Sequence, residues 1–242
     1  MATFAEMKTM VAAYMQRDAT TFTVNAVDLL GKAVNQARKW AEMERSFELN
    51  RVQTQLAISL QNGTDISGMV LASDGTTPVT VKSIIKGFLA LPDAATAVFP
   101  IDVITRDKHL ERVERHYDRV NNLTDLPKGT PNFVGYMAVV RLGNLLYLAP
   151  NDSTLYNNAT SVTVKFDSYK FLADYSADGD TDFFLTTCEN FMLLRSCYQL
   201  NFFLKDDQRV PISAAVMESA WNAVVRWDAN LVEADCADAN LD

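Results

Sequence analysis

The sequence is poor in the side chains that build most metal and redox centres. Its 242 residues include only two His and three Cys. A small, odd number of cysteines excludes a disulfide framework, so we expect all three thiols to be reduced. The two histidines, His109 and His116, lie seven residues apart, whereas helical metal pairs usually stand four apart. We therefore predict no metal centre, and cysteines at Cys188, Cys197 and Cys236 that have no redox role.

Catalytic signatures are also missing. The chain contains no G-x-S-x-G elbow, no G-x-G-x-x-G loop and no phosphate loop ending in a lysine. Cys188 and Cys197 lie in an apolar stretch, where a thiol is expected to be inert. The prediction is a protein that is not an enzyme and uses no cofactor.

Positive charge is in short supply. Lys and Arg number 22 against 30 Asp and Glu, a net charge of −8, and residues 183–242 alone carry four basic and nine acidic side chains. A duplex-binding protein needs clustered cations to contact phosphates. The densest basic stretch is interleaved with four acids, which favours i,i+4 pairs on a solvated helix or a subunit contact over DNA binding. Its basic residues are Arg106, Lys108, Arg112, Arg115 and Arg119.

Long apolar runs are absent. No stretch of about eighteen apolar residues is free of polar breaks, and no signal peptide precedes the first predicted helix. We expect no membrane insertion and synthesis in the cytoplasm. Hydrophobic residues still make up 48% of the chain, which is typical of a folded globular protein.

One acidic turn resembles part of a calcium loop. Asp178, Asp180 and Asp182 alternate, and Glu189 stands at the twelfth position counted from the first of them. The sixth position is Phe183, where a calcium loop requires glycine. A polar turn, with Asp182 capping the next helix, explains the pattern better. A ligand-binding module that holds calcium here stays as a minor alternative.

The C-terminal quarter predicts a pair of apolar helices. The helix predicted over residues 183–205 is apolar on nearly every side, so it must be covered almost all round. Pro211 is suited to the first turn of the second helix. That helix has one apolar stripe at helical spacing and ends in an acidic tail with no basic residue after Arg226. The stripe is Ala214, Met217, Trp221, Val224 and Leu231, and the tail runs through Asp228, Glu233, Asp235, Asp238 and Asp242.

The N-terminal residues predict two more helices, at 2–16 and at about 24–45. Thr23 is a plausible N-cap for the second of them. Gly31 lies inside that helix, where glycine costs roughly 1 kcal/mol relative to alanine, so its presence predicts close packing.

Between these helical ends, alternating and β-branched residues predict strands. We expect them at 47–60, 66–72, 77–90, 134–141, 145–149 and 161–175, with a hairpin turn at Gly143-Asn144 and one helix at 106–121 capped by Thr105. The predicted fold class is α+β: a helical bundle formed by residues 1–46 and 183–242, with a small antiparallel β domain, residues 47–182, inserted into it and carrying one helix.

The order of these segments resembles a known family. A Trp-Ala-Glu passage, Trp40 to Glu42, is followed by Phe47-Glu48, a β-rich insertion, a strand ending in LADY at 172–175, an acidic turn and the two C-terminal helices. This arrangement resembles the head-to-tail connectors of tailed bacteriophages, the adaptor or tail tubular protein A-like gatekeeper family. The resemblance covers most of the chain as a pattern and contains no invariant motif.

The resemblance implies a structural protein of the virion neck, assembled in the host cytoplasm. It implies a ring, usually of twelve copies, that connects the portal protein to a tail or nozzle protein and surrounds the genomic DNA without sequence-specific binding. The C-terminal segment from Asp228 to Asp242 would reach the portal. We expect oligomer or portal contacts at Trp221, Trp227, Asp228, Leu231, Glu233, Asp235 and Asp238. The alternative is another neck, tail or capsid-associated structural protein of the same particle.

Overall fold

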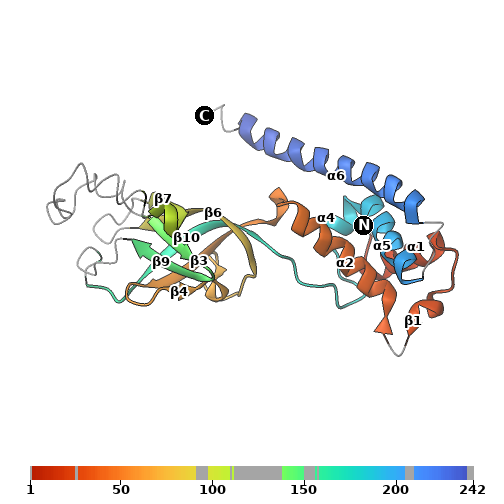
Figure 1. Ribbon diagram of the computed structural model, residues 1–242, viewed down its shortest axis with the longest axis horizontal. Helices are drawn as coiled ribbons and strands as arrows, with labels where there is room; N and C mark the ends of the chain where they lie inside the picture. The colour runs from red at the N-terminus through yellow and green to blue at the C-terminus, as the bar shows by residue number, and fades with distance from the viewer. Residues whose placement is uncertain are drawn as a thin grey trace. The chain divides into compact units, whose positions relative to one another are not determined.

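The computed structural model describes residues 2–24, 27–90, 98–109, 111, 138–149, 156, 158–204 and 210–238. The chain divides into two compact units, drawn in Figure 1. The helical unit comprises Met1–Leu49 and Ala173–Asp242, and the sheet unit comprises Asn50–Leu172. The chain therefore passes between the units twice, once after Leu49 and once before Ala173.

Two N-terminal helices begin the helical unit, α1 (Phe4–Tyr14) and α2 (Leu29–Glu44). Asp28 caps α2, because its side chain accepts a hydrogen bond of 2.9 Å from the Gly31 N–H. The predicted start of this helix near residue 24, with Thr23 as its cap, is wrong. Thr23 belongs instead to a short antiparallel pair of strands, β1 (Thr23–Val24) and β2 (Val27–Asp28).

Three C-terminal helices complete the helical unit: α4 (Phe183–Thr186), α5 (Glu189–Phe203) and α6 (Val210–Asp238). The predicted single helix over 183–205 is broken after Thr186, and the backbone leaves helical geometry at Cys188. Helix α5 packs against α1, α2 and α6. It is buried along most of its circumference, as its apolar surface predicted.

The sheet unit contains eight strands in the order β4-β9-β8-β7-β6-β10-β3-β5. Figure 1 shows them curling around a common core. Neighbouring strands pair antiparallel, except that β7 and β8 run parallel. The strands are β3 (Arg51–Ser59), β4 (Thr64–Asp65), β5 (Val70–Leu71), β6 (Val81–Ala90), β7 (Val98–Thr105), β8 (Ala138–Leu142), β9 (Leu145–Ala149) and β10 (Ser161–Lys170).

The predicted fold class is therefore wrong in its main feature. The chain is α+β, but a curled, mixed, eight-stranded sheet dominates it rather than a helical bundle carrying a small antiparallel insertion. Two causes account for the error. Strand β7 was not predicted at all, and alternation along a strand does not reveal whether its neighbour runs parallel or antiparallel.

The core of the sheet unit lies inside the curl. It is formed by inward-facing side chains of every long strand and by Tyr156, which is 1% exposed. A hydrogen-bonded pair, Thr54 and Ser168, with 3.1 Å between the two hydroxyl oxygens, is buried beside Met69. At Gly87 a Cβ atom would come within 2.9 Å of Ile101 Cγ1, so β6 and β7 approach each other more closely than a larger residue permits.

One predicted turn and part of one predicted helix in the sheet unit can be compared directly with the structure. The hairpin between β8 and β9 turns at Gly143 and Asn144 as predicted, and Gly143 has a φ of +60°. At the predicted helix 106–121, residues 106–109 and 111 are helical and the Thr105 hydroxyl accepts from the Lys108 N–H at 3.5 Å. The rest of that helix, including His116, Arg112, Arg115 and Arg119, lies outside the described residues.

Candidate functional site

Helix α6 carries most of the residues predicted to form an interface. It is 29 residues long, about 43 Å at 1.5 Å per residue. Between residues 214 and 232 only Ala220, Val224 and Asp228 are buried, which is one narrow stripe against α5. Val216 and Val232 flank the stripe and are 44% and 42% exposed. The helix is therefore held by one edge.

Two predicted interface residues belong to an aromatic cluster of the helical unit. The Trp221 ring lies 5.0 Å from that of Trp40 and 5.2 Å from that of Phe191, measured between centroids. Trp227 stacks on Phe183 at 6.1 Å. Aromatic pairs at such distances contribute about 0.5–1.5 kcal/mol each beyond the area that they bury. Both tryptophans and Leu231 are half-buried within their own chain.

Asp228 is the most deeply placed of the predicted interface residues. It is 1% exposed, and its two carboxylate oxygens accept hydrogen bonds from Arg45 Nε at 2.6 Å and from the Glu48 N–H at 3.0 Å. These donors lie at the end of α2 and at the start of the 3-10 helix Glu48–Asn50, where the chain leaves the helical unit. One carboxylate on α6 thus fixes the first of the two passages between the units.

The remaining predicted interface residues, Glu233, Asp235 and Asp238, lie on the last turns of α6, and their side chains fall outside the described part of the chain. Their role at an interface stays a prediction.

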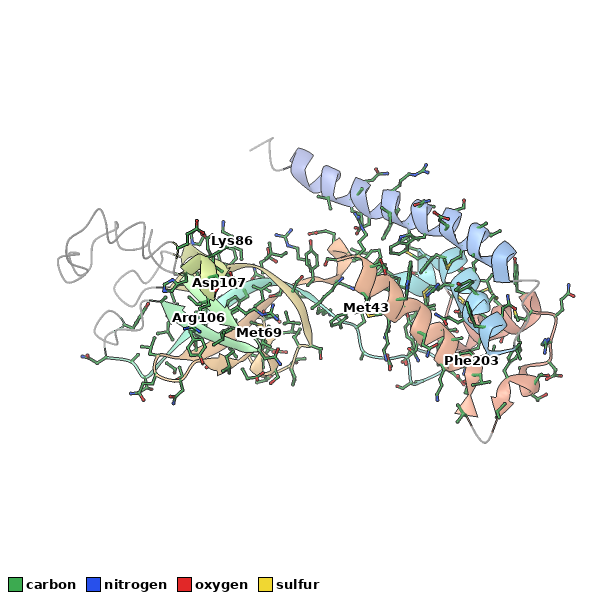
Figure 2. The ribbon with its side chains drawn as sticks, viewed as in Figure 1. Met43, Met69, Lys86, Arg106, Asp107 and Phe203 are labelled. Atoms are coloured by element: carbon green, nitrogen blue, oxygen red, sulfur yellow. The ribbon has the colours of Figure 1, made fainter. Side chains whose placement is uncertain are left out.

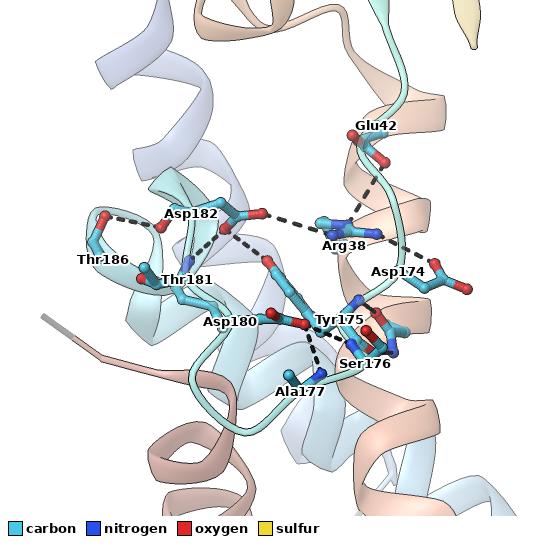
Figure 3. A network of polar contacts seen from close by, with 12 residues as sticks. Arg38, Glu42, Asp174, Tyr175, Ser176, Ala177, Asp180, Thr181, Asp182 and Thr186 are labelled. Atoms are coloured by element: carbon cyan, nitrogen blue, oxygen red, sulfur yellow. Dashed lines mark hydrogen bonds and ion pairs between the residues drawn. The ribbon is translucent and has the colours of Figure 1, made fainter. Parts of the chain in front are cut away.

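A second buried polar cluster centres on Arg38 of α2, shown in Figure 3. Arg38 is 1% exposed, and its guanidinium group lies 3.2 Å from an oxygen of Asp174, 3.7 Å from one of Asp182 and 3.8 Å from one of Glu42. The same group sits over the ring of Tyr175, 4.3 Å from its centroid. Arg38 therefore joins α2 to the segment by which the chain re-enters the helical unit.

Tyr175 and Asp182 complete this cluster. The Tyr175 hydroxyl donates to Asp182 Oδ1 at 2.6 Å, and the same oxygen accepts from the Leu185 N–H at 3.1 Å, capping α4. Burial, reinforced by the Asp182 charge, raises the pKa of the Tyr175 hydroxyl well above its ordinary value, so the phenol remains a donor. Asn35 adds two hydrogen bonds to the Tyr175 backbone, of 2.8 and 3.1 Å.

The calcium-like turn is occupied by protein groups. Asp178 pairs with Lys8 at 2.8 Å, and Asp180 accepts from the backbone N–H groups of Ser176 and Ala177. Hydrogen bonds from Ala177 and Ser176 lower the pKa of the Asp180 carboxyl. Among the described residues no group of three or more His, Cys, Asp or Glu is placed to hold a metal ion.

The described cysteines are buried and unpaired. Cys188 and Cys197 are 3% and 1% exposed. Burial raises the pKa of each thiol to about 12, so neither is a thiolate near neutral pH. Cys236 lies on α6, with its side chain outside the described set.

The sequence reading missed the three arginines that organise the helical unit. Arg38 and Arg45 anchor the two passages of the chain, and Arg195, 8% exposed, places its guanidinium 4.4 Å from the Trp40 ring and 5.1 Å from the Tyr198 ring. One signal was available: Arg38 and Glu42 stand four apart on the face that carries Val34, Ala37 and Ala41, where an unpaired charge is costly.

No protein-family model matches the chain, and no curated protein matches it either. None of the helices in the described ranges is long and apolar enough to cross a membrane.

Proposed function

We propose that the chain is a structural protein of a phage neck: an oligomeric adaptor ring that connects the portal to the tail and lines the DNA channel. The order of the segments, with its resemblance to head-to-tail connectors, supports this function. The ring would be assembled from about twelve copies in the host cytoplasm and would act without catalysis or cofactor.

One structural observation carries the proposal. Between residues 214 and 232, helix α6 is buried along a single edge, so a long surface of this part of the helix is available for contact with another chain. Other large apolar side chains of the helical unit are also exposed: Phe202 and Phe203 at the end of α5 are 59% and 55% exposed, and Met43 near the end of α2 is 66% exposed (Figure 2). Exposed apolar surface on this scale favours association with another protein.

The distribution of charge supports a lining role. The helical unit contains 10 basic and 19 acidic side chains, whereas the sheet unit contains 12 and 11. The helical unit thus has a net charge of −9 and the sheet unit a net charge of +1, so the net negative charge of the chain belongs to the helical unit. A channel lined by acidic surface repels phosphates, so the genome would pass with little adhesion and no sequence-specific contact.

The proposed partners follow from the same arrangement. The acidic C-terminal segment would contact the portal, and other surfaces of the ring would receive a tail or nozzle protein. The predicted interface residues on α6, from Trp221 to Asp238, are proposed to act at these contacts. Because Asp228 is bound to Arg45 within its own chain, its proposed role is to orient the helix.

The test combines the purified protein with purified portal rings. Sedimentation and electron microscopy of the mixture should show a second ring stacked on the portal. A matched pair of α6 variants, Val232→Glu and Asn222→Glu, separates the edge beside the buried stripe from the opposite face, since both positions are exposed. We expect Val232→Glu to weaken docking and Asn222→Glu to leave it near normal. A protein that never joins a portal, but is found elsewhere in the particle, would support the alternative of another neck, tail or capsid-associated component.

A further inference from the structure

The outer face of the sheet unit carries exposed cations between two aromatic rings. We define the cationic face as Arg51 on β3, Lys165 and Tyr169 on β10, and Lys86 and Phe88 on β6. Strand register places them together, because Lys165 pairs with Phe88, Tyr169 pairs with Arg51, and the intervening Asp167 pairs with Lys86. The residues next to them along β10, Val164, Phe166 and Ser168, point into the core and are fully buried.

The charges of the cationic face are not balanced from within it. Lys86 (Figure 2) and Lys165 are exposed, and they occupy diagonal positions, about 7–8 Å apart by sheet geometry. Asp167 is 9% exposed and is bound through both oxygens by Arg51. Asp102, at the margin on β7, is an exposed acid nearby. Phe88 and Tyr169 are half-buried, so their rings add apolar surface beside the lysines.

The C-terminal segment of the chain has the complementary composition. Residues 233–242 include Glu233, Asp235, Asp238 and Asp242 and no Lys or Arg. The helix backbone continues to Asp238, about 15 Å beyond Asp228, which is buried. An acidic segment at the end of α6 and a cationic, partly aromatic face thus occur on different units of one chain.

We propose that the cationic face binds the acidic C-terminal segment of a second copy of the chain. Because face and segment are different surfaces, the contact is head-to-tail, and its repetition forms a ring where the rotation between neighbouring copies closes. The inference rests on the proposed function in that it names the contact between copies. The contact between copies applies to the protein before it docks on the portal, since a C-terminal segment bound by the portal is no longer available to a neighbouring copy. A nucleic acid is the less suitable occupant, because the carboxylates of Asp167 and Asp102 lie among and beside the cations of the face and the chain carries a net charge of −8.

The experiment uses two charge-reversal variants of the full chain. The face variant is Lys86→Glu/Lys165→Glu, and the segment variant is Asp235→Lys/Asp238→Lys. Association is measured by sedimentation velocity at low and at high salt. Wild-type protein should associate, and salt should weaken the association because the contact is between exposed charges. Each variant alone should associate about tenfold or more weakly, and an equimolar mixture should recover, since the reversed surfaces then complement each other.

The matched control is Arg17→Glu/Lys32→Glu, which changes the net charge by the same amount as the face variant at exposed positions of the helical unit. It should associate like wild type, and circular dichroism should show all variants folded. Mixing that restores nothing, or a face variant that associates normally, overturns the inference. So does wild-type protein that stays monomeric at every concentration, or a face that binds single-stranded oligonucleotide and not a second copy.

The two proposals fail separately. If the protein forms a ring on the portal and neither charge-reversal variant changes its association, the neck function is supported and the contact between copies is contradicted. If association is sensitive to salt and is recovered by mixing the two variants, but the protein never binds a portal, the contact between copies is supported and the neck function is contradicted.

Discussion

Arg45 Nε lies 2.6 Å from Asp228 Oδ2, and this ion pair ties the C-terminal helix to the point where the chain leaves the helical unit. The two residues are 183 positions apart in the sequence. The second oxygen of the same carboxylate receives the Glu48 N–H. Asp228 therefore links α6 both to the end of α2 and to the start of the 3-10 helix Glu48–Asn50.

Replacing Asp228 with alanine should destabilise the helical unit by about 2–3 kcal/mol. Loss of the carboxylate removes the acceptor of the part-buried Glu48 N–H and one charged partner of Arg45, and the cost is moderated because the Arg45 side chain is 30% exposed. Urea unfolding measures the change. Hydrogen exchange should rise at residues 45–50 in particular. Asp18→Ala, which removes an exposed cap elsewhere, should leave exchange at 45–50 unchanged.

Arg38→Met should cost more, about 3–5 kcal/mol, because it leaves the carboxylates of Glu42 and Asp182 together without their cation. Arg38→Lys should recover only part of the loss, since an ammonium group cannot reach three carboxylates and lie flat on the Tyr175 ring. Thermal unfolding compares the two variants. The neighbouring Lys39→Met, at a half-exposed ion pair, serves as control and should cost less than about 1 kcal/mol. Equal losses of stability for Arg38→Met and Lys39→Met would contradict the role of Arg38 as the cation of the buried cluster.

Gly31→Ala should destabilise the protein even though alanine is the better helix former. The added Cβ would lie 2.8 Å from Asp28 Oδ2 and 3.1 Å from Phe4 Cζ, so it would disturb both the cap of α2 and its contact with α1. We expect a net loss of about 1–2 kcal/mol in place of the usual gain of about 1. Chemical denaturation provides the measurement. Gly179→Ala is the matched control, because a Cβ there meets nothing within 4 Å. A Gly31→Ala variant as stable as wild type would contradict the close packing.

The buried thiols predict a dependence of stability on alkaline pH. Folding raises the pKa of Cys188 and Cys197 from 9.0 to about 12. Each neutral thiol therefore contributes stability that is fully present below pH 9.0 and is lost as the pH rises towards about 12.

The burial of the two thiols is tested by labelling. In a Cys236→Ser variant, a thiol reagent near neutral pH should label neither Cys188 nor Cys197 in the folded protein and both in urea. Rapid labelling of the native variant would show that the thiols are accessible.

The sequence predicted the features that depend on local pattern. Helix α1, the hairpin at Gly143 and the need to cover α5 on most sides all follow from spacing and turn chemistry, and the structure confirms them. The close packing at Gly31 was also correct. Each of these features is determined within about one helical turn or one hairpin.

Features decided by strand pairing or by distant residues were not predictable. The start of α2 was misplaced because Thr23 and Asp28 are both good caps, and the Val24–Val27 strand pairing decides between them. Strand β7 joins β8 in parallel across residues that carry no local signal of direction. The Arg38 and Arg45 contacts unite residues more than 130 positions apart, and no periodicity reports such pairs.

The most direct test of the proposed function is cryo-electron microscopy of the purified protein mixed with portal rings from the same particle. The proposal predicts a closed ring of this chain stacked coaxially on the portal, around an open channel, with its C-terminal segment against the portal. A portal ring that remains bare at saturating protein, with the protein located elsewhere in the particle or absent from it, would contradict the proposal.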